Sequence, residues 1–534
     1  MAARFDAPFV LALDVGSSSV KGALYDARAR LVDGTLVREP SSLRVTQEGA
    51  AEVDAEGLAR RAEAVLDAVL ARPGVRGRPI AAVGLDTMVF TAAGVDAAGR
   101  PLTPLFTYAD TRPREDVLAL AGQLDLWETY QRTGCPLHTG YLPARLRWLR
   151  RVEPTLTARV QRWHDAGTWL YTRWFAGSDV AMSYSTASWS GLLDRHRLRW
   201  DAELLAHLGV DEAALPPLAE YSDPRRGLAP RFARRWRALR DVPFFLGVGD
   251  GAAANVGSGC VSPRRTALTV GTSGAMRILL PGRSPEVPPG LWAYKLGSAD
   301  TLLGGAFSTG GEALVWARSV LRLPPPPQLD RALARLPPDG HGLTVLPFLA
   351  GERSPGWSPH ARAVIDGLGG SATALQILQA CLEAVSYRFA LVARLLAPHE
   401  TAPHEIVASG GAMSRSPYWV QLMADVLQRP VALLRARELT SRGTAVLALR
   451  ALGAWSTLED VPVPREDPRL PRKGRAAVYA AALERQRGLY ETLIEKEGET
   501  ALRFGSPPGQ PAGRRVIEQE KGAARAAGDQ GQRR

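Results

Sequence analysis

The sequence has only three cysteines among its 534 residues, and Cys135, Cys260 and Cys381 lie far apart. This odd number and wide spacing exclude a disulfide framework and a cysteine-rich metal site, and favour a reducing compartment. The chain also lacks the roughly 18-residue apolar run that a membrane span needs. Its first residues, MAARFDAPFV, contain no signal-peptide pattern. We therefore expect a cytoplasmic protein with no membrane partner.

Clusters of charge of one sign are also missing. The 66 Lys and Arg residues outnumber the 54 Asp and Glu residues and give a net charge of +12, but the two signs are interleaved. Nucleic-acid-binding surfaces concentrate basic residues, so we expect no nucleic-acid partner. A basic surface would instead attract small anions. No GxxxxGK[ST] sequence is present, which argues against a P-loop nucleotide site.

Length and patterning predict the organisation of the chain. A chain of 534 residues exceeds what one hydrophobic core usually organises, so we expect two domains. Strand patterns alternate with helical patterns, which predicts an α/β protein. Helices are expected over 114–175, 371–396 and 441–452, a strand over 80–86, and a strand, turn and helix over 405–427. We expect the tryptophans of the first helical region to pack in the core or at a domain interface: Trp127, Trp148, Trp163 and Trp169.

Two similar hairpin patterns lie about 255 residues apart. The first, LALDVGSSSVKGALY, contains Asp14, and the second, TALTVGTSGAMRILL, has Thr269 at the matching place. A turn of glycine and hydroxyl residues offers N–H and O–H groups to phosphate oxygens. One such turn alone would be interpreted as a plain β-turn with solvated serines. The second copy favours a phosphate site between two related domains that face a shared cleft.

The segment GVGDGAAANVGSG has three interpretations. Gly247, Gly249 and Ala252 fit a dinucleotide fingerprint, but no acidic residue follows at the distance that a ribose requires. Asp250 could instead be a general base that accepts a proton from a substrate hydroxyl. It could also be only the N-cap of a helix, a position that Asp favours. On the residues of this segment alone, the N-cap is the favoured interpretation.

A double glycine occurs in IVASGGAMSRSPYWVQLMADVLQRPV. Gly410 and Gly411 follow an expected strand and precede an expected helix. Glycine lets a backbone approach a ligand closely. The alternative is a tight turn that serves packing alone.

Taken together, these motifs resemble the FGGY carbohydrate kinases. The resemblance runs from about Val10 to Leu452 and rests on the order of several segments. These are the two hairpins, GVGDGAAANVGSG, the double-glycine segment, LFTYADTRP, RTGCPLHTGYLPARLRWLR, STASWSGLLD and LPFLAGERSPGW. It implies two ribonuclease-H-like, actin-like ATPase domains facing each other across a catalytic cleft. We assign 1–245 to the sugar-side domain, 246–504 to the nucleotide-side domain, and 505–534 to a disordered tail.

The resemblance also implies roles for single residues, with ATP and Mg²⁺ as cofactors. Asp250 would be the general base that deprotonates the attacking hydroxyl, and Asp14 and Asp250 would lie at the metal. The nucleotide would be bound by the two hairpin turns and by two glycine pairs: Ser17, Ser18, Gly271, Thr272, Ser273, Gly310, Gly311, Gly410 and Gly411. Phosphoryl transfer needs such donors around the negative charge that spreads over the transferring phosphoryl group. It also needs a site from which water is excluded.

The sequence predicts the acceptor substrate in less detail than the nucleotide site. Asp110 and Arg112 of YADTRP match a family block, and they either contact the substrate or form a structural ion pair. Met88 and Val89 stand where many relatives have a Met-His pair that contacts the sugar. Gluconate kinase is the branch that the chain resembles most, with a xylulose or other polyol kinase as the alternative. Glycerol is disfavoured because the charged pair of glycerol kinases is missing.

A different class of function also stays open. The altered segment at Met88 would suit a non-catalytic sugar or nucleotide sensor that keeps the kinase fold. The presence of both Asp14 and Asp250 argues for the enzyme, because a binding protein needs them less. The sequence leaves the oligomeric state open, with a homodimer as one option.

Overall fold

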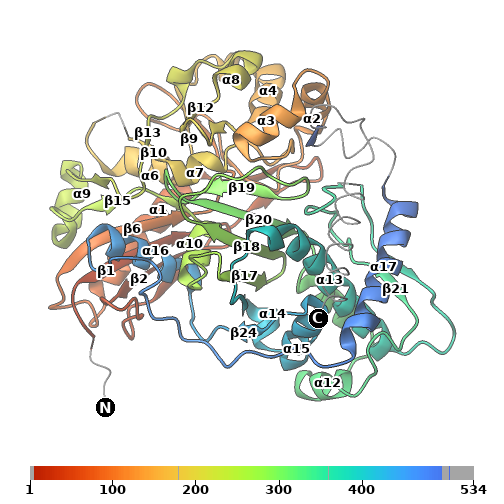
Figure 1. Ribbon diagram of the computed structural model, residues 1–534. Coiled ribbons are helices and arrows are strands. Elements are labelled where there is room, and N and C mark those ends of the chain that lie inside the picture. Colours follow the sequence, from red (N-terminus) through yellow and green to blue (C-terminus); the bar gives the residue numbers. More distant parts are fainter. Residues whose placement is uncertain (1–4, 178–179, 359, 496–503, 506–534) are drawn as a thin grey trace.

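The computed structural model describes residues 5–177, 180–358, 360–495 and 504–505. Two sheets dominate it, one built from the first half of the chain and one from the second (Figure 1). The predicted tail at 505–534 falls almost wholly outside the described residues. None of the described helices is both long and apolar enough to cross a membrane.

The first sheet has a mixed topology. Its spatial order is β14 (Pro224–Arg225), β15 (Phe244–Phe245), β6 (Ile80–Thr87), β1 (Phe9–Val15), β2 (Ser19–Tyr25) and β3 (Val37–Pro40). Strand β2 pairs antiparallel with both β3 and β1, whereas β6 runs parallel to both β1 and β15. A further strand, β16 (Val248–Gly249), also pairs with β6 in parallel. The first sheet therefore reaches past the predicted boundary at residue 245.

The second sheet repeats this topology. Its order is β19 (Trp292–Lys295), β20 (Thr301–Phe307), β18 (Gly274–Leu280), β17 (Arg265–Val270), β23 (Glu405–Ser409) and β24 (Val431–Leu433). Again an antiparallel hairpin, here β17–β18, is followed by strands parallel to its first member. The two hairpins predicted from the sequence are thus equivalent elements of two similar sheets.

Helices cover both faces of the first sheet. Side chains alternate along a strand, so Leu11 and Leu13 of β1 pack toward α1 (Ala55–Ala71), whereas Ala12 faces the opposite side. On that opposite side lies α16 (Leu439–Ala451), a helix from near the end of the chain that packs against β1 and β6 (Figure 1). Asp14 shares the α16 side with Ala12.

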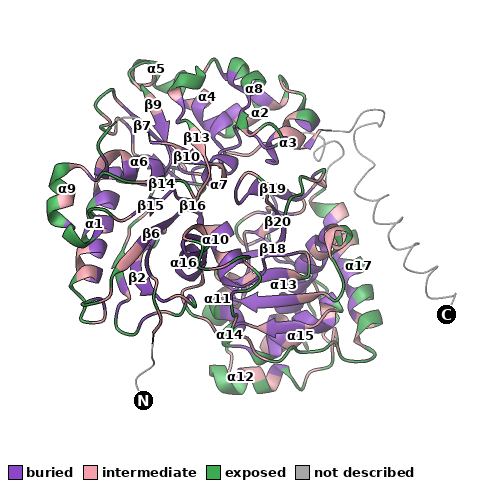
Figure 2. Ribbon diagram, turned by 60° about the vertical axis from the view of Figure 1, so that its left-hand side comes forward, coloured by how far each residue is buried: buried purple, intermediate pink, exposed green. Residues whose placement is uncertain are grey.

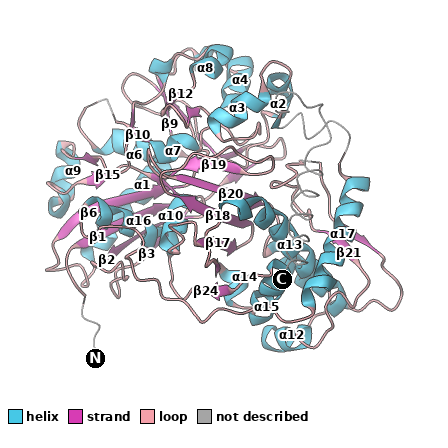
Figure 3. Cartoon of the chain, viewed as in Figure 1, coloured by secondary structure: helices cyan, strands magenta, loops and turns pink. Residues whose placement is uncertain are grey.

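Helices of the second half gather beside the second sheet (Figure 3). They are α10 (Asp250–Gly257), α11 (Glu312–Val320), α12 (Pro326–Leu333), α13 (Ala374–Leu396), α14 (Gly411–Ser414), α15 (Pro417–Leu427) and α17 (Arg475–Leu493). Helix α13 begins at a capping box in which Thr373 and Gln376 exchange hydrogen bonds. A short ladder joins β21 (Thr344–Leu346) to β22 (Val364–Asp366). The strands of both sheets are mostly buried, and the exposed residues lie on outer helices (Figure 2).

The region between the predicted strand at 80–86 and β15 forms a helical cap. Its helices are α2 (Arg114–Ala121), α3 (Leu126–Thr133), α4 (Leu142–Val152), α5 (Pro154–Thr157), α6 (Ala166–Trp174), α7 (Tyr184–Ser188), α8 (Ala202–Leu208) and α9 (Pro230–Arg235). Small ladders connect them: β4 (Arg44–Val45), β5 (Ala51–Val53) and β8 (Leu105–Phe106); β7 (Ala93–Val95) and β9 (Arg162–His164); β10 (Met182–Ser183) and β13 (Leu218–Ala219); β11 (Leu193–Asp194) and β12 (Arg199–Trp200). Three single-turn 3₁₀ helices complete the chain at 212–214, 237–239 and 397–399.

The predicted helical region 114–175 is thus mostly helical but interrupted by β9. Trp127, Trp163 and Trp169 are buried as expected, and Trp148 packs partly buried against the cap core.

Candidate active site

Three aspartates gather at the carboxyl ends of neighbouring parallel strands. Asp14 of β1 lies opposite Asp86 of β6 in the strand register, and Val248 of β16 also pairs with Asp86. Asp250 follows two residues later, as the first residue of α10. Because these strands are parallel, all three carboxylates meet at one edge of the sheet.

Burial makes this carboxylate group unusual. Asp14 is 5 % exposed and Asp86 is 0 % exposed. Burial raises the pKa of both carboxyl groups, and the charge of Asp14 raises the pKa of Asp86 further. Lys21 Nζ lies 3.2 Å from Asp14 Oδ2 and 2.9 Å from Glu438 Oε2, so this ammonium group is shared between two carboxylates.

One carboxylate oxygen of Asp86 has no protein partner in the described structure. Thr444 of α16 donates a hydrogen bond of 2.6 Å to Asp86 Oδ2, whereas Oδ1 has no hydrogen-bond partner among the described residues. Mg²⁺ takes oxygen ligands and is usually held by one or two carboxylates together with phosphates. Asp14 and Asp86, with Asp250 beside them, provide such ligands.

Asp250 does not cap its helix. The N-cap position belongs to Gly249, and the Asp250 carboxylate accepts a hydrogen bond of 2.7 Å only from the adjacent N–H of Gly251 among the described residues. Burial, and then the charge of Asp14, raise the pKa of Asp250 to about 6; the Gly251 N–H and Arg277 act in the opposite direction. A carboxylate with a pKa near the working pH suits a general base.

The two hairpin turns have similar geometry. In the first, the Gly16 N–H donates to the Ser19 carbonyl at 3.1 Å, with Ser17 partly and Ser18 fully exposed. In the second, the Gly271 N–H donates to the Ser273 carbonyl at 2.9 Å. Thr272 and Ser273 are exposed, and their side chains make no hydrogen bond in the described structure. Both turns therefore present hydroxyl groups to the space between the sheets.

Family models match these two halves separately. Residues 9–257 match the N-terminal domain of the FGGY family of carbohydrate kinases, and residues 266–452 match its C-terminal domain. The chain belongs to the FGGY family of carbohydrate kinases. It is therefore a phosphotransferase with an alcohol group as acceptor, and the predicted two-domain fold is confirmed.

The relatives of this FGGY kinase match nearly its whole length. It is 25 % identical over 466 residues to a gluconokinase of Bacillus subtilis, covering 85 % of this chain and 89 % of the relative. A gluconate kinase structure from Lactobacillus acidophilus superposes with a TM-score of 0.85 at 24 % identity, covering 91 % and 98 % of the two chains. A Plasmodium falciparum glycerol kinase structure with ADP gives a TM-score of 0.80 at 18 % identity, covering 92 % and 100 %.

The predicted nucleotide glycines of the kinase converge on the second turn. The N–H groups of Gly310 and Gly311 donate to the carbonyls of Thr272 and Gly271, at 3.0 and 2.7 Å. A Cβ added to Gly410, whose φ is +99°, would lie 2.3 Å from the Val270 carbonyl. Packing alone thus requires glycine at 410. The N–H groups of 310 and 311 hold the turn in place, and direct nucleotide contact stays a prediction.

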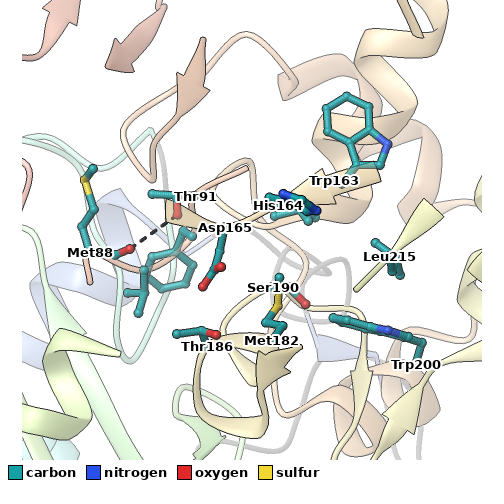
Figure 4. A pocket seen from close by; sticks show the side chains of 13 residues that line it. Met88, Thr91, Trp163, His164, Asp165, Met182, Thr186, Ser190, Trp200 and Leu215 are labelled. Atoms are coloured by element: carbon teal, nitrogen blue, oxygen red, sulfur yellow. Dashed lines mark hydrogen bonds between the residues drawn. The ribbon is translucent and has the colours of Figure 1, made fainter. Parts of the chain in front are cut away.

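The predicted sugar-side residues Met88 and Val89 both line one pocket. Val89 approaches the reaction centre, since its Cγ1 lies 2.8 Å from where a Cβ on Gly249 would be. The same pocket is also lined by Thr91, His164 and Asp165 (Figure 4). The Thr91 hydroxyl donates to the Met88 carbonyl at 3.5 Å and fixes this corner.

Asp110 and Arg112 form an ion pair. The Arg112 guanidinium reaches both Asp110 and Glu52, and its centre lies 4.5 Å from the Trp148 ring. Asp110 is 0 % exposed. The ion-pair alternative is therefore what the structure shows, and direct substrate contact of these residues stays a prediction.

Sequence reasoning missed an aromatic wall beside Asp250. Phe90 packs edge-on against Tyr141 and Trp189, with ring centroids 5.1 and 5.3 Å apart, and Trp189 stacks on Tyr294 at 3.7 Å. The Tyr141 and Tyr294 hydroxyls are 2.6 Å apart, which joins the two halves of the chain. The buried Arg145 donates to the Phe90 carbonyl and holds this residue at a φ of +61°. Aromatic residues scattered over 200 positions left no local pattern.

Asp86 was also missed, although its signal was present. The run IAAVGLD was interpreted only as a buried strand, yet it ends on aspartate as LALD does. Two apolar strands that each end on a carboxylate predict a shared acidic edge once the strands are paired in parallel.

A second group of possible metal ligands lies elsewhere, at Asp339, His341 and Glu383. Arg485 binds both oxygens of Asp339 at 2.6 and 2.7 Å, and Glu383 accepts hydrogen bonds from His341 and Tyr387. These protein partners satisfy the group, so it serves as a structural network.

Proposed function

We propose that this FGGY kinase transfers the γ-phosphate of ATP to a hydroxyl of a small sugar acid, as a gluconokinase does. The gluconokinase and gluconate kinase relatives support this acceptor class, and the ADP in the glycerol kinase relative supports an adenine nucleotide as donor. A xylulose-type sugar or another polyol is the alternative acceptor. We further propose a cytoplasmic enzyme, consistent with three buried free cysteines. A homodimer stays a prediction that light scattering would test.

The observation that carries this proposal is the placement of Asp250. Its carboxylate lies beside the acidic edge and accepts one hydrogen bond from the residues that the structure describes, and its pKa of about 6 leaves it ionised at neutral pH. It accepts the proton of the attacking hydroxyl in our proposal. Asp14 and Asp86 hold the metal side, and Mg²⁺ would neutralise charge on the phosphates. The turns at 16–19 and 271–273 orient the phosphate chain through N–H and hydroxyl groups.

The test combines an acceptor screen with one substitution. ADP release is measured with gluconate, xylulose, ribulose, glycerol and erythritol, and gluconate is expected to give the highest kcat/KM. Asp250→Asn should lower kcat by ~10³-fold while the Kd for ATP stays within roughly twofold. Wild-type activity should fall as the pH is lowered through about 6, because the base becomes protonated. Full activity of Asp250→Asn would remove Asp250 as the base.

The same screen decides the sensor alternative. ATP turnover that depends on an added acceptor excludes a non-catalytic sensor. Acceptor binding by calorimetry without any turnover would support it.

A further inference from the structure

Two arginines face the space next to Asp250 without an anionic partner. Arg277 lies on β18 opposite Gly304 of β20, and its Nε is 3.8 Å from where a Cβ on Gly251 would be. Its Nη1 is buried and has no hydrogen-bond partner in the described structure. A buried guanidinium N–H that donates to nothing is costly, unless a ligand supplies the acceptor.

The second arginine is brought to the same place by its neighbour in the sequence. Ser354 exchanges two hydrogen bonds with Ala306 of β20, at 2.9 and 3.1 Å, and Ala306 pairs with Ala275 of β18. Arg353 therefore comes directly before a residue held at Ala306, which lies two positions along β20 from the Gly304 that pairs with Arg277. Burial is the largest cause that lowers the pKa of Arg277, and the positive charge of Arg353 lowers it further.

Three other buried arginines in the described structure each have a partner for part of the guanidinium group. Arg388 contacts the carboxylate of Glu352, Arg195 donates to Ser284 and two carbonyls, and Arg442 donates to two carbonyls. Within the described residues, Arg277 and Arg353 make neither an ion pair nor a side-chain hydrogen bond. Two buried guanidinium groups without ion-pair or hydrogen-bond partners indicate a binding site for an anion.

The position of the pair indicates which anion it takes. Arg277 Nε and the Trp189 ring both lie beside Gly251, 3.8 and 2.9 Å from where a Cβ on that glycine would be. Tyr141 and Tyr294 of the aromatic wall also act on the pKa of Arg353, which they raise against the larger effect of burial. The pair thus extends from the base toward the aromatic end of the cleft, on the acceptor side. The predicted phosphate turns, by contrast, are formed by residues 16–19 and 271–273. A planar carboxylate accepts two parallel hydrogen bonds from each guanidinium, which favours arginine over lysine.

We propose that Arg277 and Arg353 bind the carboxylate of the acceptor and thereby make this kinase select sugar acids over neutral polyols of the same length. This inference rests on the proposed function, because it concerns the acceptor of the same reaction. The segment Met88-Val89-Phe90 offers only apolar side chains on this wall, so the arginines supply the charge that recognises the acid.

The experiment compares gluconate with glucitol, which has a CH₂OH group in place of the carboxylate. Arg277→Gln and Arg353→Gln should each raise the KM for gluconate by ~30-fold and change kcat/KM for glucitol by less than roughly threefold. Arg277→Lys should recover part of the loss, because it keeps the charge but not the planar fork. Arg240→Gln is the matched control, since Arg240 is an exposed arginine without an ion pair in the described structure.

Three results would overturn the inference. Equal loss of kcat with both acceptors would show that the arginines act on the transferring phosphoryl group. An unchanged KM for gluconate would show that they do not contact the acid. A wild-type preference for glucitol would refute acid selectivity while leaving the kinase function intact.

Failure of the proposed function itself gives a different result. If the wild-type protein turns over no acceptor, calorimetry of gluconate and glucitol binding still decides the role of the pair. Selective gluconate binding that Arg277→Gln abolishes supports it, and equal binding of both compounds contradicts it. The lysine variants keep this comparison available if a glutamine variant fails to fold, as judged by circular dichroism.

Discussion

The two hairpins share a backbone plan and differ in chemistry at one pair of positions. Asp14 of β1 lies opposite Asp86 of β6, and the equivalent residues of the second sheet, Thr269 and Ser409, lie opposite each other in the same register. The first pair is two carboxylates. The second pair is two hydroxyls, with oxygens 3.1 Å apart. One fold has therefore placed an acidic edge on one side of the cleft and a neutral edge on the other.

This difference separates the two tasks of a kinase. A metal ion and a hydroxyl proton both require negative charge nearby, whereas a triphosphate is repelled by it. In our proposal, the neutral pair lets phosphates approach the second turn, and the acidic pair with Asp250 serves the metal and the acceptor. The acidic side is electrostatically costly, because burial raises the pKa of both Asp14 and Asp86. The hydroxyl pair has no such cost.

The largest difference in activity between equivalent substitutions is expected at position 14. Asp14→Asn should lower kcat by ~10³-fold, about 4 kcal/mol, because it removes a charge from the metal side. Thr269→Val, the equivalent change in the second hairpin, should lower kcat by less than roughly fivefold. Both are measured by ADP release over a range of Mg²⁺ concentrations, and Asp14→Asn should require more Mg²⁺. Similar losses in both variants would contradict the division of tasks.

Much of this arrangement could be predicted from the sequence, because its signals were local. The hairpins, the glycines and Asp250 each lie in a short segment that has its own pattern. The residues that were missed depend on pairing between distant segments. Asp86 becomes informative only when β6 is placed beside β1, and Arg277 is a single polar residue in an apolar strand.

The return of α16 to the first sheet was missed for a similar reason. A helical pattern at 441–452 was recognised, but a pattern does not say which sheet a helix covers. Gly84 explains the placement: a Cβ there would lie 2.9 Å from Thr444 Cγ2 and 3.0 Å from its carbonyl. This close approach brings the Thr444 hydroxyl to Asp86. The domain boundary at residue 245 thus stays a prediction. Helix α16 comes from the second half of the chain but packs against the sheet of the first half.

A smaller effect is expected at Gly271 of the second turn. A Cβ there meets only the Ser273 carbonyl at 3.8 Å, so the fold tolerates alanine. If phosphates approach this turn, Gly271→Ala should raise the KM for ATP by ~10-fold and leave the melting temperature unchanged. Gly310→Ala is the contrasting variant: its Cβ would lie 2.5 Å from the Ser273 carbonyl, which predicts a lower melting temperature. An unchanged KM for ATP in Gly271→Ala would place the phosphates elsewhere.

The smallest expected effect is on stability. A neutral residue at position 86 should stabilise the fold and lower the activity. The folded protein holds the Asp86 proton more tightly than the unfolded chain does, because burial and Asp14 raise its pKa well above 3.8. Stability in the absence of metal and nucleotide should therefore fall as the pH rises above about 4. Asp86→Asn removes this penalty and keeps an oxygen for the Thr444 hydroxyl. We expect it to raise the free energy of unfolding by about 1 kcal/mol at pH 7.5 while kcat falls.

The equivalent position in the neutral pair provides the control. Ser409→Ala should keep the pH dependence of the wild type and change stability by the same amount at both pH values, since no charge is removed. Urea unfolding of both variants and the wild type at pH 4.5 and 7.5 measures the difference, which should shrink at the lower pH for Asp86→Asn. If Asp86→Asn is instead less stable than the wild type at pH 7.5, then the buried carboxylate is stabilised by its surroundings. In that case the contrast between a costly acidic edge and a neutral one would not hold.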